Sequence, residues 1–82
     1  YIQSMVIYKD ENIIALNKPS GLAVQGGTNT TRHVDGMLEA LCFGAQEKPK
    51  LVHRIDKDTS GILILARNRK SADMLTKAFR EL

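Results

Sequence analysis

Short apolar runs alternate with polar turns along the first quarter of the chain. The runs at 5–8 (MVIY) and 13–17 (IIALN) are β-prone, and the polar segment 9–12 (KDEN) lies between them. This pattern predicts an antiparallel β-hairpin. The segment 18–21 (KPSG) then ends the second strand, because proline fixes its own φ and glycine allows a turn with positive φ.

A helical pattern follows a second loop, at 25–31, that is rich in turn-forming residues. Within 34–43, apolar residues recur at the spacing of one helical face, namely Val34, Met37, Leu38 and Leu41. Thr30 or Thr31 is the predicted N-cap of this helix, and Gly44 is placed to end it.

The second half of the chain reads as strand, turn, strand and helix. The apolar pair 51–52 precedes a polar turn at 53–61, and the continuous apolar run 62–66 predicts a strand covered on both faces. Asn68 or Ser71 is the predicted cap of a final helix. The apolar stripe of that helix comprises Met74, Leu75, Ala78, Phe79 and Leu82. The expected order is β-β-loop-α-loop-β-turn-β-α, a mixed α/β (α+β) fold with a mainly antiparallel sheet and flanking helices.

Composition restricts the class of protein more than its function. The 82 residues, 43% hydrophobic and 26% charged, suit one small globular domain and exclude a disordered chain of low hydrophobicity. The longest apolar run, 62–66, is far shorter than the roughly 20 residues that span a bilayer. The single cysteine, Cys42, excludes an internal disulfide and is expected to pack as a small hydrophobic group. The net charge of +3 is compatible with a polyanionic partner without requiring one.

The polar turn at 53–61 (HRIDKDTSG) gathers the side chains with most chemical potential. It holds a histidine, two cations, two carboxylates and two hydroxyls between apolar runs. Residue types alone leave two readings open. In the first, the turn is structural, and its aspartates pair with Arg54 or Lys57. In the second, buried strands hold these groups in place as a reactive site.

Two other chemistries fit the turn poorly. The segment 56–61 begins like a calcium-binding loop, but Arg67 stands where that loop needs a glutamate, and the flanking segments read as strands. A serine–histidine–aspartate triad built on Ser60 lacks the Gly-x-Ser-x-Gly elbow that would present the nucleophile.

Two ordered motifs resemble those of a known family. The sequence HRIDKDTSG at 53–61 is similar to the H-R-L-D-x-x-T-S-G signature of RluA-type pseudouridine synthases, with Ile55 in place of leucine. The sequence NKPSGL at 17–22 resembles the upstream N-K-P-x-G motif of the same family. The resemblance implies a partial pseudouridine synthase catalytic fold that isomerises uridines in RNA, with ribosomal RNA favoured. It implies RNA (ribosomal or transfer) as partner, with no cofactor, no metal and no membrane.

The resemblance also assigns the chemical roles within the turn. Asp56 corresponds to the catalytic aspartate, and Arg54 corresponds to an arginine that contacts RNA around a flipped-out nucleotide. Residue type alone leaves Arg54 an ion pair with a neighbouring carboxylate as its other role. His53 is expected to orient the loop, and residues 59–61 are expected to shape the turn.

Four further cations are expected to add sequence-independent affinity for the RNA backbone. They are Lys18, Lys57, Arg67 and Arg69.

The chain is shorter than the complete catalytic domains of the family, which place a tyrosine against the uracil and a basic partner for the aspartate further downstream. Residues 1–82 are therefore expected to be the N-terminal portion of such a domain and to be inactive alone. The expected compartment is the bacterial cytoplasm or, alternatively, the mitochondrion. Two other hypotheses are a non-catalytic RNA-binding piece or degenerate paralogue and, more weakly, a small cation-binding module.

Overall fold

A four-stranded antiparallel sheet forms the centre of the computed structural model, which describes residues 1–26 and 32–82. The strands are β1 (Val6–Lys9), β2 (Ile13–Lys18), β3 (Lys50–Leu51) and β4 (Gly61–Ala66), in the spatial order β1-β2-β4-β3. Two 3-10 helices, η1 (Ile2–Met5) and η2 (Asp35–Leu41), and the α-helix α1 (Arg69–Arg80) complete the described elements. The predicted hairpin and the α+β class are confirmed; η1 was not predicted.

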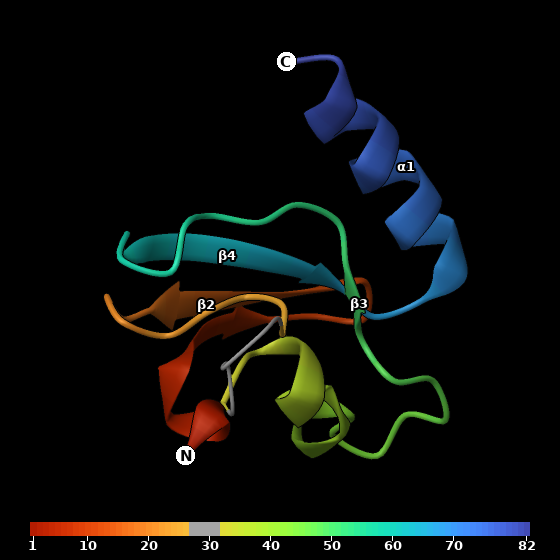
Figure 1. The fold of residues 1–82 in the computed structure, drawn as a ribbon. Helices are drawn as coiled ribbons and strands as arrows, with labels where there is room; N and C mark the ends of the chain where they lie inside the picture. The colour runs from red at the N-terminus through yellow and green to blue at the C-terminus, as the bar shows by residue number, and fades with distance from the viewer. Residues whose placement is uncertain (27–31) are drawn as a thin grey trace.

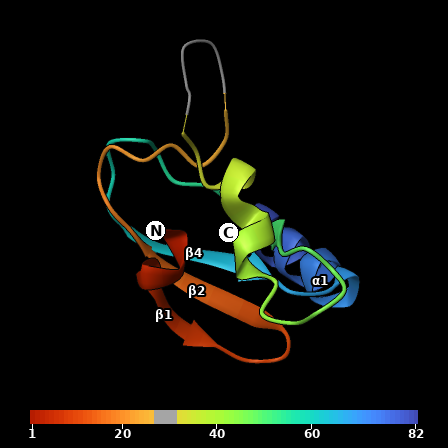
Figure 2. The ribbon, with the colours of Figure 1, turned by 90° about the horizontal axis from the view of Figure 1, so that it is seen from below.

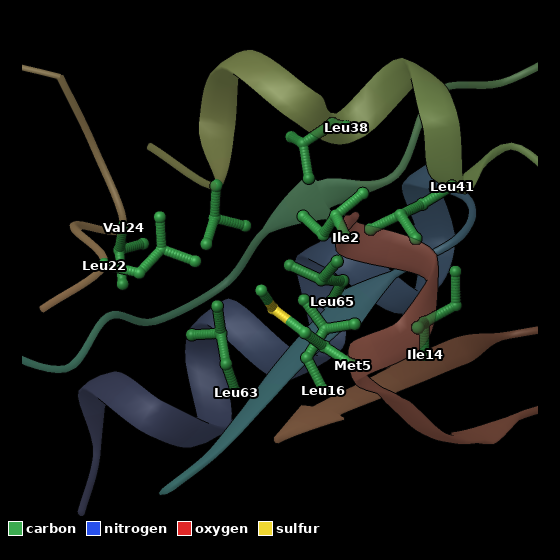
Figure 3. Packing of buried hydrophobic residues seen from close by; sticks show 11 residues of the cluster. Ile2, Met5, Ile14, Leu16, Leu22, Val24, Leu38, Leu41, Leu63 and Leu65 are labelled. Carbon is green, nitrogen blue, oxygen red and sulfur yellow. The ribbon is translucent and has the colours of Figure 1, made fainter. Parts of the chain in front are cut away.

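The main core lies between one face of the sheet and the helices η1 and η2 (Figure 1). Alternation along β2 and β4 sends every second side chain to this face, and the ladder pairs Ile14 with Leu65 and Leu16 with Leu63. The two 3-10 helices close the face with Ile2, Met5, Leu38 and Leu41, as Figure 3 shows.

Helix α1 covers only part of the other face of the sheet. Ala72, Leu75 and Phe79 pack there with Val52, Ile64 and Ala66. Ile62, nearer the polar turn, remains 50% exposed, so the prediction that the whole 62–66 strand is covered on both faces was wrong. The stripe predicted for α1 is likewise only half used, because Met74 is 63% exposed and Leu82 lies beyond the helix at 97% exposure.

The predicted helix ends are partly confirmed. Asn68 caps α1, and its side-chain oxygen accepts a hydrogen bond of 2.8 Å from the Ser71 amide. The middle helix is shorter and more tightly wound than its pattern suggested, because it begins at Asp35 as a 3-10 helix with Val34 at the cap position. The caps predicted at Thr30 and Thr31 lie outside the described residues.

Beyond η2 the chain reverses through Phe43 and Gly44, with φ of 47° and 84°. These left-handed values confirm that Gly44 follows the end of this helix. Among the residues described, no helix is both long enough and apolar enough to cross a membrane.

Two neighbouring residues of β4, Leu63 and Ile62, lie on opposite faces of the sheet and test which face is more deeply buried. Leu63→Ala should destabilise the chain by about 2–5 kcal/mol, because it opens a cavity in the main core. Ile62→Ala should cost less than about 1 kcal/mol, because that side chain is half exposed. Urea unfolding of the 82-residue chain measures both values, and equal losses would contradict the assignment of faces.

Candidate active site

The polar turn between β3 and β4 lies beside the segment that follows β2, although 39 residues separate Lys18 from Lys57 (Figure 1 and Figure 2). The Gly21 amide donates to the Lys57 carbonyl at 2.8 Å, and the Ser20 hydroxyl donates to the Asp58 carbonyl at 2.8 Å. The Thr59 amide donates to the Asp56 carbonyl at 3.0 Å and closes the turn. The two sequence motifs are therefore in contact, and hydrogen bonds from the first motif hold the turn that the second motif forms.

The strongest link between the motifs is the buried ammonium of Lys18. Lys18 is the last residue of β2 on the core-facing side, opposite Gly61, and it is fully buried. Its Nζ donates to the carbonyl oxygens of Leu22 (2.7 Å), Pro19 (3.0 Å) and Lys57 (3.0 Å). A buried ammonium must have acceptors for its donors, and here the acceptors are the backbones of both motifs.

This arrangement corrects the RNA contact predicted for Lys18. All three of its donors are used inside the protein, so none faces an RNA phosphate. Burial lowers the pKa of the Lys18 ammonium, and the nearby carboxylate of Asp58 partly opposes that change.

His53 fixes the start of the turn, as expected. Its Nε2 accepts a 2.9 Å hydrogen bond from the Ile64 amide, and its ring stacks on that of Phe79 in α1 with centroids 4.1 Å apart. Because Nε2 must be unprotonated to accept, this geometry requires the neutral imidazole with its proton on Nδ1. Burial lowers the pKa of His53 and favours that same neutral form.

Asp56 lies exposed at a shallow hollow of about 260 Å³. The hollow is lined by residues of the second motif and of the segment that follows the first, namely Ala23, Val24, Gln25, Arg54, Ile55, Asp56 and Lys57. The lining of this hollow therefore includes a carboxylate and two cationic residues. The expectation that two buried strands hold the turn is met only in part. Strand β4 is largely buried, but β3 consists of two half-buried residues, and the aspartates of the turn are solvent-exposed.

Arg54 hydrogen-bonds a neutral partner rather than a carboxylate. Its Nη1 donates to the side-chain oxygen of Gln25 at 3.0 Å. In the part of the chain that the structure describes, the one salt bridge joins Lys50 and Glu47, outside the turn. The ion pairs considered for a purely structural turn are therefore not formed by these residues. Gln25 was missed by the sequence reasoning, since a lone glutamine in a loop carries no signal.

Gly61 ends the turn and begins β4 with a φ of 147°, a value that side-chain-bearing residues rarely adopt. The expected role of this glycine in shaping the turn therefore has a backbone cause. The Ser20 and Thr59 hydrogen bonds complete the same turn.

Arg67 does not join the other candidate residues. It follows β4 at the end away from the turn, where its guanidinium donates to the carbonyl oxygens of Asp10 (2.8 Å) and Cys42 (3.0 Å). Arg67 thus ties the β1–β2 connection to the end of η2, away from the Asp56 hollow, and the RNA-backbone affinity expected of it stays a prediction. Arg69 begins α1 at the same end and is exposed. Lys57 is exposed at the hollow.

No group of three or more histidine, cysteine, aspartate or glutamate side chains within residues 1–26 and 32–82 is arranged to hold a metal ion. An exposed carboxylate, held on a turn that hydrogen bonds join to the segment after β2 and flanked by cationic residues, can act on an electron-poor carbon or accept a proton.

Comparison with solved structures defines the class. The structure of human RNA Pseudouridylate Synthase Domain Containing 4 matches with a TM-score of 0.83 and 28% sequence identity, over 98% of this chain and 31% of that one. The sequence profile of the RNA pseudouridylate synthase family matches residues 12–82. The chain belongs to this family, as its RluA-type motifs predicted.

Curated relatives are similar along nearly the whole chain. RNA pseudouridine synthase 4, mitochondrial, from Arabidopsis thaliana is 49% identical over 82 residues, which cover 99% of this chain and 17% of that protein. Ribosomal large subunit pseudouridine synthase C from Rickettsia conorii is 49% identical over 76 residues, covering 93% and 25%. The chain thus spans a quarter or less of the length of these two relatives.

Lys18→Met tests the buried ammonium as a structural clamp. The methionine keeps most of the apolar stem but leaves the carbonyls of Pro19 and Leu22 without this donor. The free energy of unfolding should fall by about 1–3 kcal/mol, the cost of unsatisfied buried polar groups. Lys48→Met, at an exposed lysine, should change it by less than about 0.5 kcal/mol. Equal losses of unfolding free energy in the two variants, measured by urea unfolding, would show that Lys18 is not a structural clamp.

His53 should make stability depend on pH. Its pKa is lower in the folded chain than the value of about 6.5 expected when unfolded, so folding favours the neutral ring. The stabilisation is full above that unfolded value and is lost as the pH falls through the folded-state pKa. Wild-type unfolding free energy should therefore fall more than that of His53→Gln between about pH 7.5 and pH 5. Parallel curves would show that this histidine is not the titrating group.

Proposed function

We propose that this protein is an RNA pseudouridine synthase that uses Asp56 as its catalytic carboxylate. The observation that carries the proposal is the position of Asp56, which is exposed beside Arg54 at the same hollow. Hydrogen bonds from Lys18 and Gly21 to the Lys57 carbonyl hold the turn on which Asp56 lies. Membership of the RNA pseudouridylate synthase family supports the same reaction. The proposal concerns the complete gene product, because the chain spans only part of each relative's length.

The reaction needs one well-placed carboxylate. The bond between C1′ of the ribose and N1 of uracil breaks, the base turns, and C5 of the same base bonds to C1′ while the proton on C5 moves to N1. An ionised Asp56 can assist departure of the base by attacking C1′ or by accepting the C2′ proton, which it later returns. Both routes require an accessible carboxylate, and Asp56 is exposed.

Arg54 is proposed to contact the RNA around the target nucleotide. Arg54 borders the same hollow as Asp56, and its observed side-chain partner is the neutral Gln25. A uridine stacked in a helix must leave the stack to reach a carboxylate, and an arginine at the rim can hold the backbone of the displaced nucleotide. Lys57, also at the hollow, adds charge for the same backbone.

The proposed substrate is ribosomal RNA, with transfer RNA as the alternative. The Rickettsia conorii relative is named for the large ribosomal subunit, and the Arabidopsis thaliana relative is named as mitochondrial. The proposed compartment is accordingly the cytoplasm of a bacterium or, alternatively, a mitochondrion.

The two aspartates of the turn provide a matched test. Asp56→Asn in the complete gene product should lower pseudouridine formation on the order of 100-fold to 10,000-fold, because the variant loses the carboxylate that acts on the ribose. Asp58→Asn, the same change two residues away, should retain most of the activity because its contact with Ser20 is made by the backbone carbonyl. Pseudouridine mapping on RNA from cells carrying each variant, or lacking the gene, measures both.

The same sites should disappear in the deleted strain and in the Asp56→Asn strain. Sites that disappear with the gene but persist with Asp56→Asn would contradict the catalytic role. RNA binding without any gene-dependent site would favour a non-catalytic RNA-binding protein.

A further inference from the structure

The hydrogen bond between Arg54 and Gln25 separates two hollows on the surface. One, of about 260 Å³, contains Asp56; the other, of about 220 Å³, is lined by Gln25, Leu51, Val52, His53 and Arg54. Gln25 and Arg54 are the two residues common to both linings. The pair therefore forms the wall between the Asp56 hollow and its neighbour.

The backbone that carries Gln25 is anchored at Val24 on one side and passes close to His33 on the other. Val24, just before it, is buried in the main core, and its carbonyl accepts a 2.9 Å hydrogen bond from the Asp35 amide. Gly26, just after it, passes so close to His33 that a Cβ there would lie 2.7 Å from the ring Nε2. The side chain of Gln25 thus extends from a well-anchored base.

A glutamine suits the task of holding an RNA-binding arginine. Its amide oxygen accepts one of the five guanidinium N–H groups but brings no charge, so the positive charge of Arg54 is not neutralised. A glutamate at the same place would form an ion pair and compete with phosphate. Holding a long side chain in one orientation before RNA arrives also lowers the entropy lost on binding.

We infer that Gln25 is a positioning residue that orients Arg54 at the rim of the Asp56 hollow while leaving its charge available to the RNA backbone. This inference rests on the RNA contact proposed for Arg54. It assigns to Gln25 no contact with the reacting atoms.

Two substitutions at Gln25 separate orientation from charge. Gln25→Met removes the acceptor and adds no charge, and Gln25→Glu keeps an acceptor and adds a negative charge. Gln46→Met and Gln46→Glu make the same changes at an exposed glutamine between η2 and β3. Binding of the complete gene product to a short fluorescein-labelled oligouridylate, measured by anisotropy over a series of salt concentrations, compares the four variants.

Gln25→Met should weaken binding roughly twofold to tenfold, the range for one hydrogen bond, with the salt dependence unchanged. Gln25→Glu should also make the slope of log K against log salt shallower by about 0.7, the value for one phosphate contact on a single strand. The Gln46 variants should show neither effect. In an Arg54→Gln background, the Gln25 variants should add nothing beyond their Gln46 counterparts.

The single variant Arg54→Gln distinguishes a wrong role for Gln25 from a wrong RNA contact for Arg54. If it weakens binding and the Gln25 variants still behave like their Gln46 controls, the role of Gln25 is wrong and the RNA contact of Arg54 stands. If Arg54→Gln changes neither affinity nor slope, the proposed RNA contact is wrong, and the inference on Gln25 is overturned with it. Thermal midpoints of the Gln25 variants should equal that of the wild type, because Gln25 is exposed.

Discussion

The arrangement of the site depends on one buried charge, the ammonium of Lys18. Strand alternation turns this side chain into the core at the end of β2, where it must find acceptors. It finds them in the carbonyls of Pro19, Leu22 and Lys57, and so joins the segment after β2 to the turn before β4. Asp56 itself can then remain exposed, because the rigidity of its turn comes from the buried layer beneath it. Exposure of Asp56 would provide access for the proposed RNA substrate, and the hydrogen bonds of Lys18 hold the turn in a defined geometry.

Much of the fold was predictable because its signals are local. The hairpin, the last helix and the order of elements follow from apolar periodicity and capping chemistry, with Asn68 one of the two caps that the sequence offered. The errors concern which apolar surfaces meet. In the run 62–66, apolar and polar residues do not alternate, so the sequence does not show which face of the strand is less covered. Ile62 is half exposed because α1 packs towards the Ala66 end of β4.

The site was predictable where a motif names a residue and unpredictable where contacts decide. The motif resemblance singled out Asp56 and Arg54, and both border one hollow. Lys18 and Arg67 were expected to bind RNA because each is a cation near a motif, yet both donate to backbone carbonyls. Lys18 follows Ile14 and Leu16 at the two-residue spacing of one strand face, and this spacing is a sequence signal that could have placed it in the core. Gln25 had no such signal, since its pairing with Arg54 spans 29 positions.

The most direct test of this account is the rate of pseudouridine formation by Lys18→Met at saturating RNA, compared with its affinity for the same RNA. Loss of the buried ammonium that holds the Asp56 turn should lower the saturated rate, because the carboxylate is misplaced. RNA affinity should fall by a smaller factor, through Arg54 on the same turn. The assay uses the complete gene product well below the unfolding temperature of the variant. Weakened RNA affinity with an unchanged saturated rate would contradict the structural role of Lys18 and would indicate that it contacts RNA.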